Sequence, residues 1–111
     1  MAPQVLSPQL RSMSTDPLAC GVCRLHADPG LGEGLGLHRS DTWLLRHHPH
    51  PSPLVGWLLL DTVRHRAGPA DFDAREAAGF GAMLQRSSAL VKECTGCDRV
   101  YAIAFGEGAH H

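Results

Sequence analysis

Four cysteines give this chain its clearest capacity for metal chemistry, and they fall into two C-x-x-C pairs. The first pair is Cys20 and Cys23, which we expect in a tight turn that can direct two thiolates at one tetrahedral ion, above all zinc. The alternatives are a redox pair or two small hydrophobic side chains. A thioredoxin-like redox site would require a strand before the pair and a helix after it. Pro17 precedes this pair and a glycine-rich turn follows it soon after, so a redox site is disfavoured.

The second pair is Cys94 and Cys97, and most of the chain separates it from the first. A Cys₄ site built from both pairs would exceed the spacing of ordinary zinc ribbons. We therefore expect these two cysteines to pack at a helix end rather than to bind a metal. A zinc module that uses both pairs stays open as an alternative.

Histidine is unusually frequent, with eight residues. His65 directly follows an expected strand and is a candidate third ligand, although its position between two arginines also suits an ordinary surface residue. The group His47, His48 and His50 lies in a proline-rich stretch, which favours an exposed loop over the mouth of a phosphate or metal pocket. The last two residues, His110 and His111, also suit an exposed end or the remainder of a purification tag.

The bulk composition excludes several classes of protein. The length of 111 residues suits one domain, with residues 18–111 forming the domain and 1–17 a flexible N-terminal tail. The formal net charge of −1 gives no basic field that would favour nucleic acid. No apolar run is long enough for a membrane span and no signal peptide is evident, so we expect a cytoplasmic protein that binds neither membranes nor nucleic acids.

The hydropathy pattern predicts an α+β fold, an antiparallel sheet with one long helix packed on it. The expected strands cover 37–39, 42–46, 54–63 and 99–105, and the last two are expected to be buried. The helix is expected from Ala74 to about Cys94, with Asp73 and Glu76 as its capping box and Gly96 after its end. Its expected core stripe is Ala77, Phe80, Leu84, Ser87 and Val91.

Taken together, the order of these motifs resembles the histidine-triad (HIT) family, in particular its zinc-binding bacterial branch, which is similar to diadenosine polyphosphate hydrolases. The resemblance covers roughly residues 18–111. It rests on the stretches Cys20-Gly21-Val22-Cys23, Gly56-Trp57-Leu58-Leu59-Leu60 ending at Arg64-His65, Asp73-Ala74-Arg75-Glu76, and Gly96 through Glu107.

The resemblance implies a closed, structural zinc site formed by Cys20, Cys23, His65 and His111. It also aligns His111 with the first histidine of the catalytic triad. The nucleophilic middle histidine would then lie beyond the end of this chain, so we expect a HIT-like domain that is incomplete at its C-terminal end. Glu107 is expected near the nucleotide, and a homodimer is a possible assembly.

The family implies an activity as well: nucleotidyl hydrolysis of nucleoside phosphates or dinucleoside polyphosphates through a histidine nucleophile. The alternative is a zinc-stabilised, non-catalytic protein that binds nucleotides. One departure from the family pattern is that Arg46 to Pro49 stand near the position where relatives commonly carry an acidic residue for the ribose. We therefore do not assign a ribose contact there.

Overall fold

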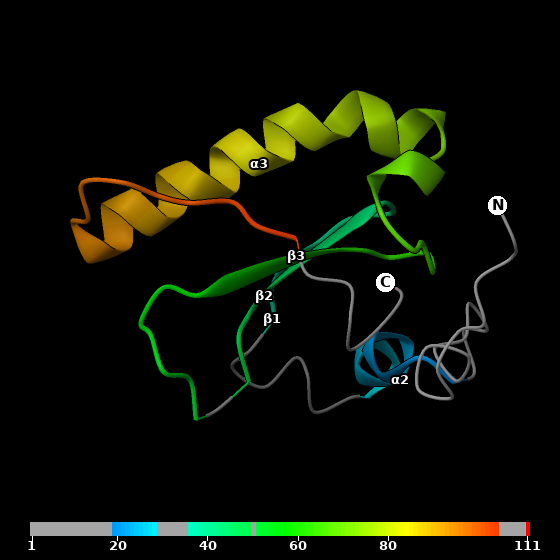
Figure 1. The fold of residues 1–111 in the computed structure, drawn as a ribbon, viewed down its shortest axis with the longest axis horizontal. Helices are drawn as coiled ribbons and strands as arrows, with labels where there is room; N and C mark the ends of the chain where they lie inside the picture. Colours follow the sequence, from blue (N-terminus) through cyan, green and yellow to red (C-terminus); the bar gives the residue numbers. More distant parts are fainter. Residues whose placement is uncertain (1–18, 29–35, 50, 105–110) are drawn as a thin grey trace, which may run out of the picture.

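The computed structural model describes residues 19–28, 36–49, 51–104 and 111. Figure 1 shows a small sheet with the long helix α3 along one side and the short helix α2 on the other. This arrangement confirms the expected α+β class. The elements are α2 (Gly21–Ala27), β1 (Gly36–Arg39), β2 (Trp43–His47), β3 (Leu58–Thr62), the 3₁₀ turn η3 (Pro69–Asp71) and α3 (Ala74–Thr95).

The sheet is antiparallel with the order β1-β2-β3, so β2 is the central strand. Leu45 is paired with Leu60 and Trp43 with Thr62. The register between β1 and β2 shifts between Gly36 and His38. The strands at 37–39 and 42–46 were thus predicted to within a residue at each end.

Strand β2 is buried on both of its faces because a helix covers each one. On the α3 side, the Trp43 ring meets Phe72 and Phe80, with centroids 5.5 and 5.7 Å away. On the α2 side, the buried Arg46 side chain reaches Asp61 of β3. The central strand therefore separates an aromatic layer from a charged layer.

Helix α3 begins and ends as the sequence predicts. The Asp73 side chain accepts the Glu76 backbone N–H, and the Glu76 side chain accepts the Asp73 N–H, which completes the capping box. Gly96 ends the helix in the left-handed conformation, with φ of 69°. This conformation is open to glycine at little cost.

The expected stripe along α3 is correct except at its first position. Phe80, Leu84, Ser87 and Val91 are half-buried, but Ala77 is exposed. In the first turn the inward position belongs instead to Glu76, which is 1% exposed. The next residue points about 100° away around the helix axis, toward solvent.

The strand expected over 54–63 is shorter in the structure, where β3 covers only Leu58–Thr62. Leu54 and Val55 are 65% and 85% exposed and precede a turn at Gly56, whose φ is 82°. A Cβ at Gly56 would lie 2.9 Å from Cγ2 of Thr95, so the end of α3 packs directly on this turn. A side chain there is excluded by both the backbone conformation and the available space.

The buried strand expected over 99–105 is wrong for the part that is described. Residues 99–104 form no strand, and Tyr101 and Ile103 are 74% and 69% exposed. The preference of apolar and β-branched residues for strands reflects the packing of their side chains on a paired, half-buried sheet. No described strand pairs with residues 99–104, so that packing is absent here. Phe105 and the expected tail at 1–17 lie outside the described residues.

In the described part, no helix combines the length and apolarity that a membrane crossing requires.

Replacing Glu76 with alanine should lower the free energy of unfolding by about 2 kcal/mol, because Arg66 Nε and the Asp73 N–H lose their buried acceptor. Both groups donate to Glu76 Oε1, at 2.9 and 2.7 Å. Urea unfolding followed by circular dichroism measures the change. Glu93→Ala, at an exposed position of the same helix, is the control and should change stability by less than about 0.5 kcal/mol. Equal losses in the two variants would contradict the buried role of Glu76.

Candidate metal centre

Helix α2 carries the first cysteine pair. Cys20 is the N-cap residue, and its Sγ accepts the backbone N–H of Cys23 at 3.4 Å. The pair therefore stands at the start of a helix rather than in the expected tight turn. The sequence did not indicate this helix because seven residues that include Gly21 are too few for a helix to form without tertiary contacts.

Cys20, Cys23, His65 and His111 come together in one cluster, with one ligand atom from each lying within 4.8 Å of the others. Cys23 Sγ is 3.3 Å from His65 Nδ1 and 3.4 Å from His111 Nδ1. Cys20 Sγ is 3.5 Å from the same His111 nitrogen. Three segments far apart in the chain thus direct two thiols and two imidazoles at one point.

These separations fit a tetrahedral ion. Zinc bonds of about 2.0–2.1 Å to nitrogen and 2.3 Å to sulfur place neighbouring ligand atoms about 3.3–3.8 Å apart. The three sulfur-to-nitrogen distances of 3.3 to 3.5 Å agree with that range, and all four ligand atoms lie within 4.8 Å of one another. The cluster can therefore hold a metal ion without a large rearrangement.

His111 is oriented by its second ring nitrogen. Its Nε2 lies 2.7 Å from the carbonyl oxygen of Thr62, at the end of β3. A donated Nε2–H leaves Nδ1 deprotonated and directed at the cysteines, which is how a second hydrogen bond commonly orients a metal-binding histidine.

His65 reaches the cluster from the loop after β3. The next residue, Arg66, holds this loop against the start of α3 through Asp73 and the buried Glu76. The helix cap and the position of His65 thus depend on the same ion pairs. His65 Nε2 is buried without a partner among the described residues.

The surroundings of the cluster shift the pKa of two of the candidate ligands. Burial, together with the neighbouring Cys20 thiol, raises the pKa of Cys23 to about 11. Burial also lowers the pKa of His111 below its usual value, although the hydrogen bond to Thr62 opposes that shift. A metal must displace the thiol protons, so its affinity rises with pH.

A charged layer lies beside the cluster and was not indicated by the sequence. His26 Nε2 is 2.9 Å from Asp61 Oδ2, and Asp61 also accepts from Arg46. The rings of His26 and His111 meet edge to face, with centroids 5.1 Å apart. The spacing of Cys23 and His26, three residues apart on one helix face, is the signal that could have identified this neighbour.

The other candidate residues that the structure describes do not join the cluster. Cys94 and Cys97 are free thiols at the far end of α3. His47 Nδ1 and His48 Nδ1 lie against backbone carbonyl oxygens, and His48 stacks on Trp57. The remaining candidates, His50, Glu107 and His110, lie outside the described residues.

No protein-family model, curated protein or solved structure matches this chain. The resemblance to the HIT family therefore stays a prediction from sequence motifs. The metal cluster is supported separately, by the distances between its ligand atoms.

Asp61→Asn should lower the free energy of unfolding by about 2–3 kcal/mol at pH 7, because Arg46 then loses its buried counter-charge. Burial opposes ionisation of Asp61, but the bonds from His26 and Arg46 outweigh it and lower the pKa below 3.8. The stabilisation is therefore present above about pH 4 and is lost as the pH falls through the folded-state pKa. Unfolding measured against pH in a chelator, so that metal release adds nothing, should show the difference from wild type shrinking in acid.

Asp41→Asn is the matched control, since Asp41 is 89% exposed and forms only a 3.7 Å pair with Arg75. It should change stability by less than about 0.5 kcal/mol. A difference for Asp61→Asn that stays constant from pH 7 to pH 3 would contradict the assigned ion pair.

Proposed function

We propose that this chain binds one Zn²⁺ through Cys20, Cys23, His65 and His111, and that the ion has a structural role. The observation that carries the proposal is the convergence of these four ligand atoms within 4.8 Å. The motif resemblance assigns the same four residues independently of these distances.

The donor set favours zinc over other common ions. Two thiolates and two imidazoles suit zinc, whereas calcium and magnesium require oxygen ligands. Four protein ligands also fill a tetrahedral shell, so no position stays open for a substrate. An ion in this site holds segments together rather than activating water.

Single substitutions test the ligand set. Cys20→Ala, Cys23→Ala and His65→Ala should each weaken zinc binding by roughly 100-fold or more, because a closed four-ligand site loses one donor. Zinc content by elemental analysis and native mass spectrometry measures the effect. A chelator should also lower the melting temperature of the wild-type protein.

The Cys94→Ala/Cys97→Ala double variant is the control and should keep one zinc ion per chain. The proposal is wrong if His65→Ala and His111→Ala leave the bound zinc unchanged while the control variant abolishes it. That result would support a zinc module built from the two cysteine pairs.

We further propose that the zinc-stabilised fold binds a nucleoside phosphate or a dinucleoside polyphosphate, as the HIT resemblance implies. Support comes from the motifs that carry the resemblance. The resemblance assigns nucleophilic attack to a histidine that is not among these 111 residues. The proposal made here is nucleotide binding, and hydrolysis through a histidine nucleophile is the enzyme activity that the same resemblance implies.

Calorimetric titration of the zinc-loaded chain with AMP and with diadenosine tetraphosphate tests this second proposal. We expect saturable binding of both and weaker binding of adenosine, because the phosphate supplies the charge-assisted contacts. Equal binding of adenosine and AMP, or binding of neither nucleotide, would contradict it. Release of AMP from the dinucleotide, measured by chromatography, would decide for the enzyme over the non-catalytic binder.

A further inference from the structure

A pocket of about 240 Å³ opens between the long helix α3 and the part of the sheet formed by β1 and β2. The helix packs on β3, at the other edge of the sheet, and its end packs on the turn at Gly56. The space over β1 and β2 is lined by His38, Leu45, Met83, Arg86, Ser87 and Leu90. None of these residues belongs to the metal cluster.

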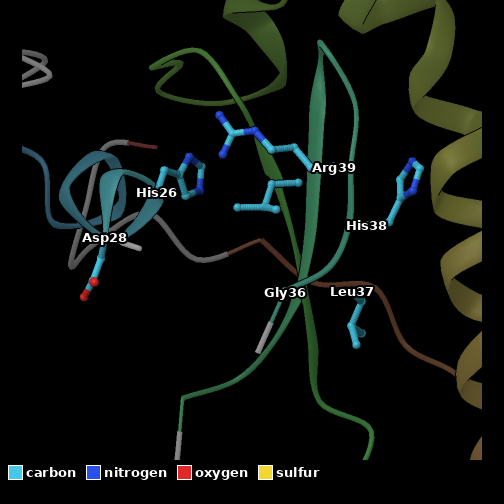
Figure 2. Close-up of a pocket in the computed structure, with 7 residues that line it drawn as sticks. His26, Asp28, Gly36, Leu37, His38 and Arg39 are labelled. Atoms are coloured by element: carbon cyan, nitrogen blue, oxygen red, sulfur yellow. The ribbon is translucent and has the colours of Figure 1, made fainter. Parts of the chain in front are cut away.

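This pocket lies on the face of the sheet opposite to α2. Side chains alternate between the two faces along a strand, so Leu45 shares the α3 side with Trp43. His38 is paired with Leu45 and faces the same side. Figure 2 shows His38 directed toward α3, while His26 and Arg39 point toward one another on the α2 side. The sheet therefore separates this pocket from the metal cluster.

The inner surface of the pocket is apolar. Leu45 is buried in the sheet, Met83 is half-buried on α3, and Leu90 stands at the rim. Met83, Ser87 and Leu90 are four and three residues apart, so they form one row along the helix. Such a lining suits an aliphatic group, and the small volume limits the occupant to a short one.

One hydroxyl group in this lining has no partner. Ser87 Oγ is buried and forms no hydrogen bond with any of the described residues. The next hydroxyl along the helix, in contrast, is satisfied, because Ser88 Oγ donates to the carbonyl oxygen of Leu84 at 2.8 Å. Buried polar atoms are normally hydrogen-bonded, so the unpartnered Ser87 hydroxyl indicates a place for the polar group of a ligand.

A cation stands beside that hydroxyl. Arg86 is exposed and takes part in none of the ion pairs among the described residues. No acidic residue lines the pocket. The charge of the lining therefore favours an anionic occupant.

A carboxylate fits this lining better than a phosphate monoester does. An arginine fork binds a carboxylate through two parallel hydrogen bonds, and one arginine balances its single charge. A phosphate monoester carries roughly 1.5 to 2 negative charges at pH 7, which the lining would leave partly unbalanced.

We propose that this pocket binds a short aliphatic carboxylate, with Arg86 holding the carboxylate, the Ser87 hydroxyl donating to it, and the apolar surface taking the chain. The site is independent of the zinc and nucleotide proposals, because it uses none of the metal-cluster residues and lies on the other face of the sheet.

Calorimetric titrations of the zinc-loaded chain with hexanoate, acetate and 1-hexanol separate the two parts of the lining. Hexanoate should bind more tightly than acetate, which lacks the chain, and more tightly than 1-hexanol, which lacks the charge. AMP should not displace hexanoate, since the proposed site excludes the nucleotide.

Substitutions test the two polar residues separately. Arg86→Gln should weaken hexanoate binding about tenfold, the size expected for one charge-assisted contact near solvent. Arg86→Lys should retain part of the affinity, because it keeps the charge but loses the fork. Ser87→Ala should weaken binding severalfold without lowering the melting temperature of the ligand-free protein, because the hydroxyl has no protein partner to lose.

Arg39→Gln is the matched control, since Arg39 is also an exposed arginine without an ion pair among the described residues but points to the α2 side. It should leave the affinity for hexanoate unchanged within twofold. The melting temperature and zinc content of each variant establish that the fold is intact. The proposal is overturned if hexanoate shows no saturable binding at millimolar concentration, if 1-hexanol binds equally well, if AMP displaces hexanoate, or if Arg86→Gln and Arg39→Gln have the same effect.

Discussion

The fold depends on a small apolar core that is centred on one strand. In the part of the chain that the structure describes, the buried apolar side chains are Cys20 and three consecutive residues of β2, Trp43, Leu44 and Leu45. These buried side chains of the described residues contribute only limited hydrophobic stabilisation by themselves. Additional links between its segments must supply the difference, and the structure places them on both sides of β2.

Those links are polar, and each connects different elements of the fold. On the α2 side, Asp61 joins β3 to Arg46 of β2 and to His26 of α2. On the α3 side, Glu76 joins the helix start to Arg66 of the loop that carries His65. Buried charges of this kind stabilise a fold only when they are fully paired. Their pairing here fixes α2 and the His65 loop, the two elements that present three of the four metal-cluster residues.

The sequence predicted the parts of the fold whose signals are local. The capping box of Asp73 and Glu76, the left-handed Gly96 and the apolar residues of β2 each act within a few positions, and each was placed correctly. Helix α2 was missed because its stability comes from contacts with distant segments, not from the propensity of its own residues. The apolar stretch at 99–104 was misassigned because its pattern cannot reveal whether a partner strand is present.

In the candidate site, too, the local sequence signals were identified and the long-range contacts were not. Spacing alone made Cys20 and Cys23 a candidate metal pair. His65 and His111 were favoured as ligands only through the family resemblance, since no local pattern links them to the pair. The network of His26, Asp61 and Arg46 was not foreseen, because it joins residues of three elements that come together only in the folded chain. Apart from the helical spacing of Cys23 and His26, tertiary proximity of this kind has no signature in a single sequence.

The bond from His111 Nε2 to the Thr62 carbonyl has a topological consequence. Together with the contacts of Cys23, which is 42 residues from His65 and 88 from His111, it brings widely separated points of the chain to one place. An ion held there would close two large loops, one containing the sheet and the other containing α3. Closing a loop removes entropy mainly from the unfolded chain, and the cost of further length is small. The ion would therefore act as a reversible cross-link, and its departure would release both loops at once rather than one element at a time.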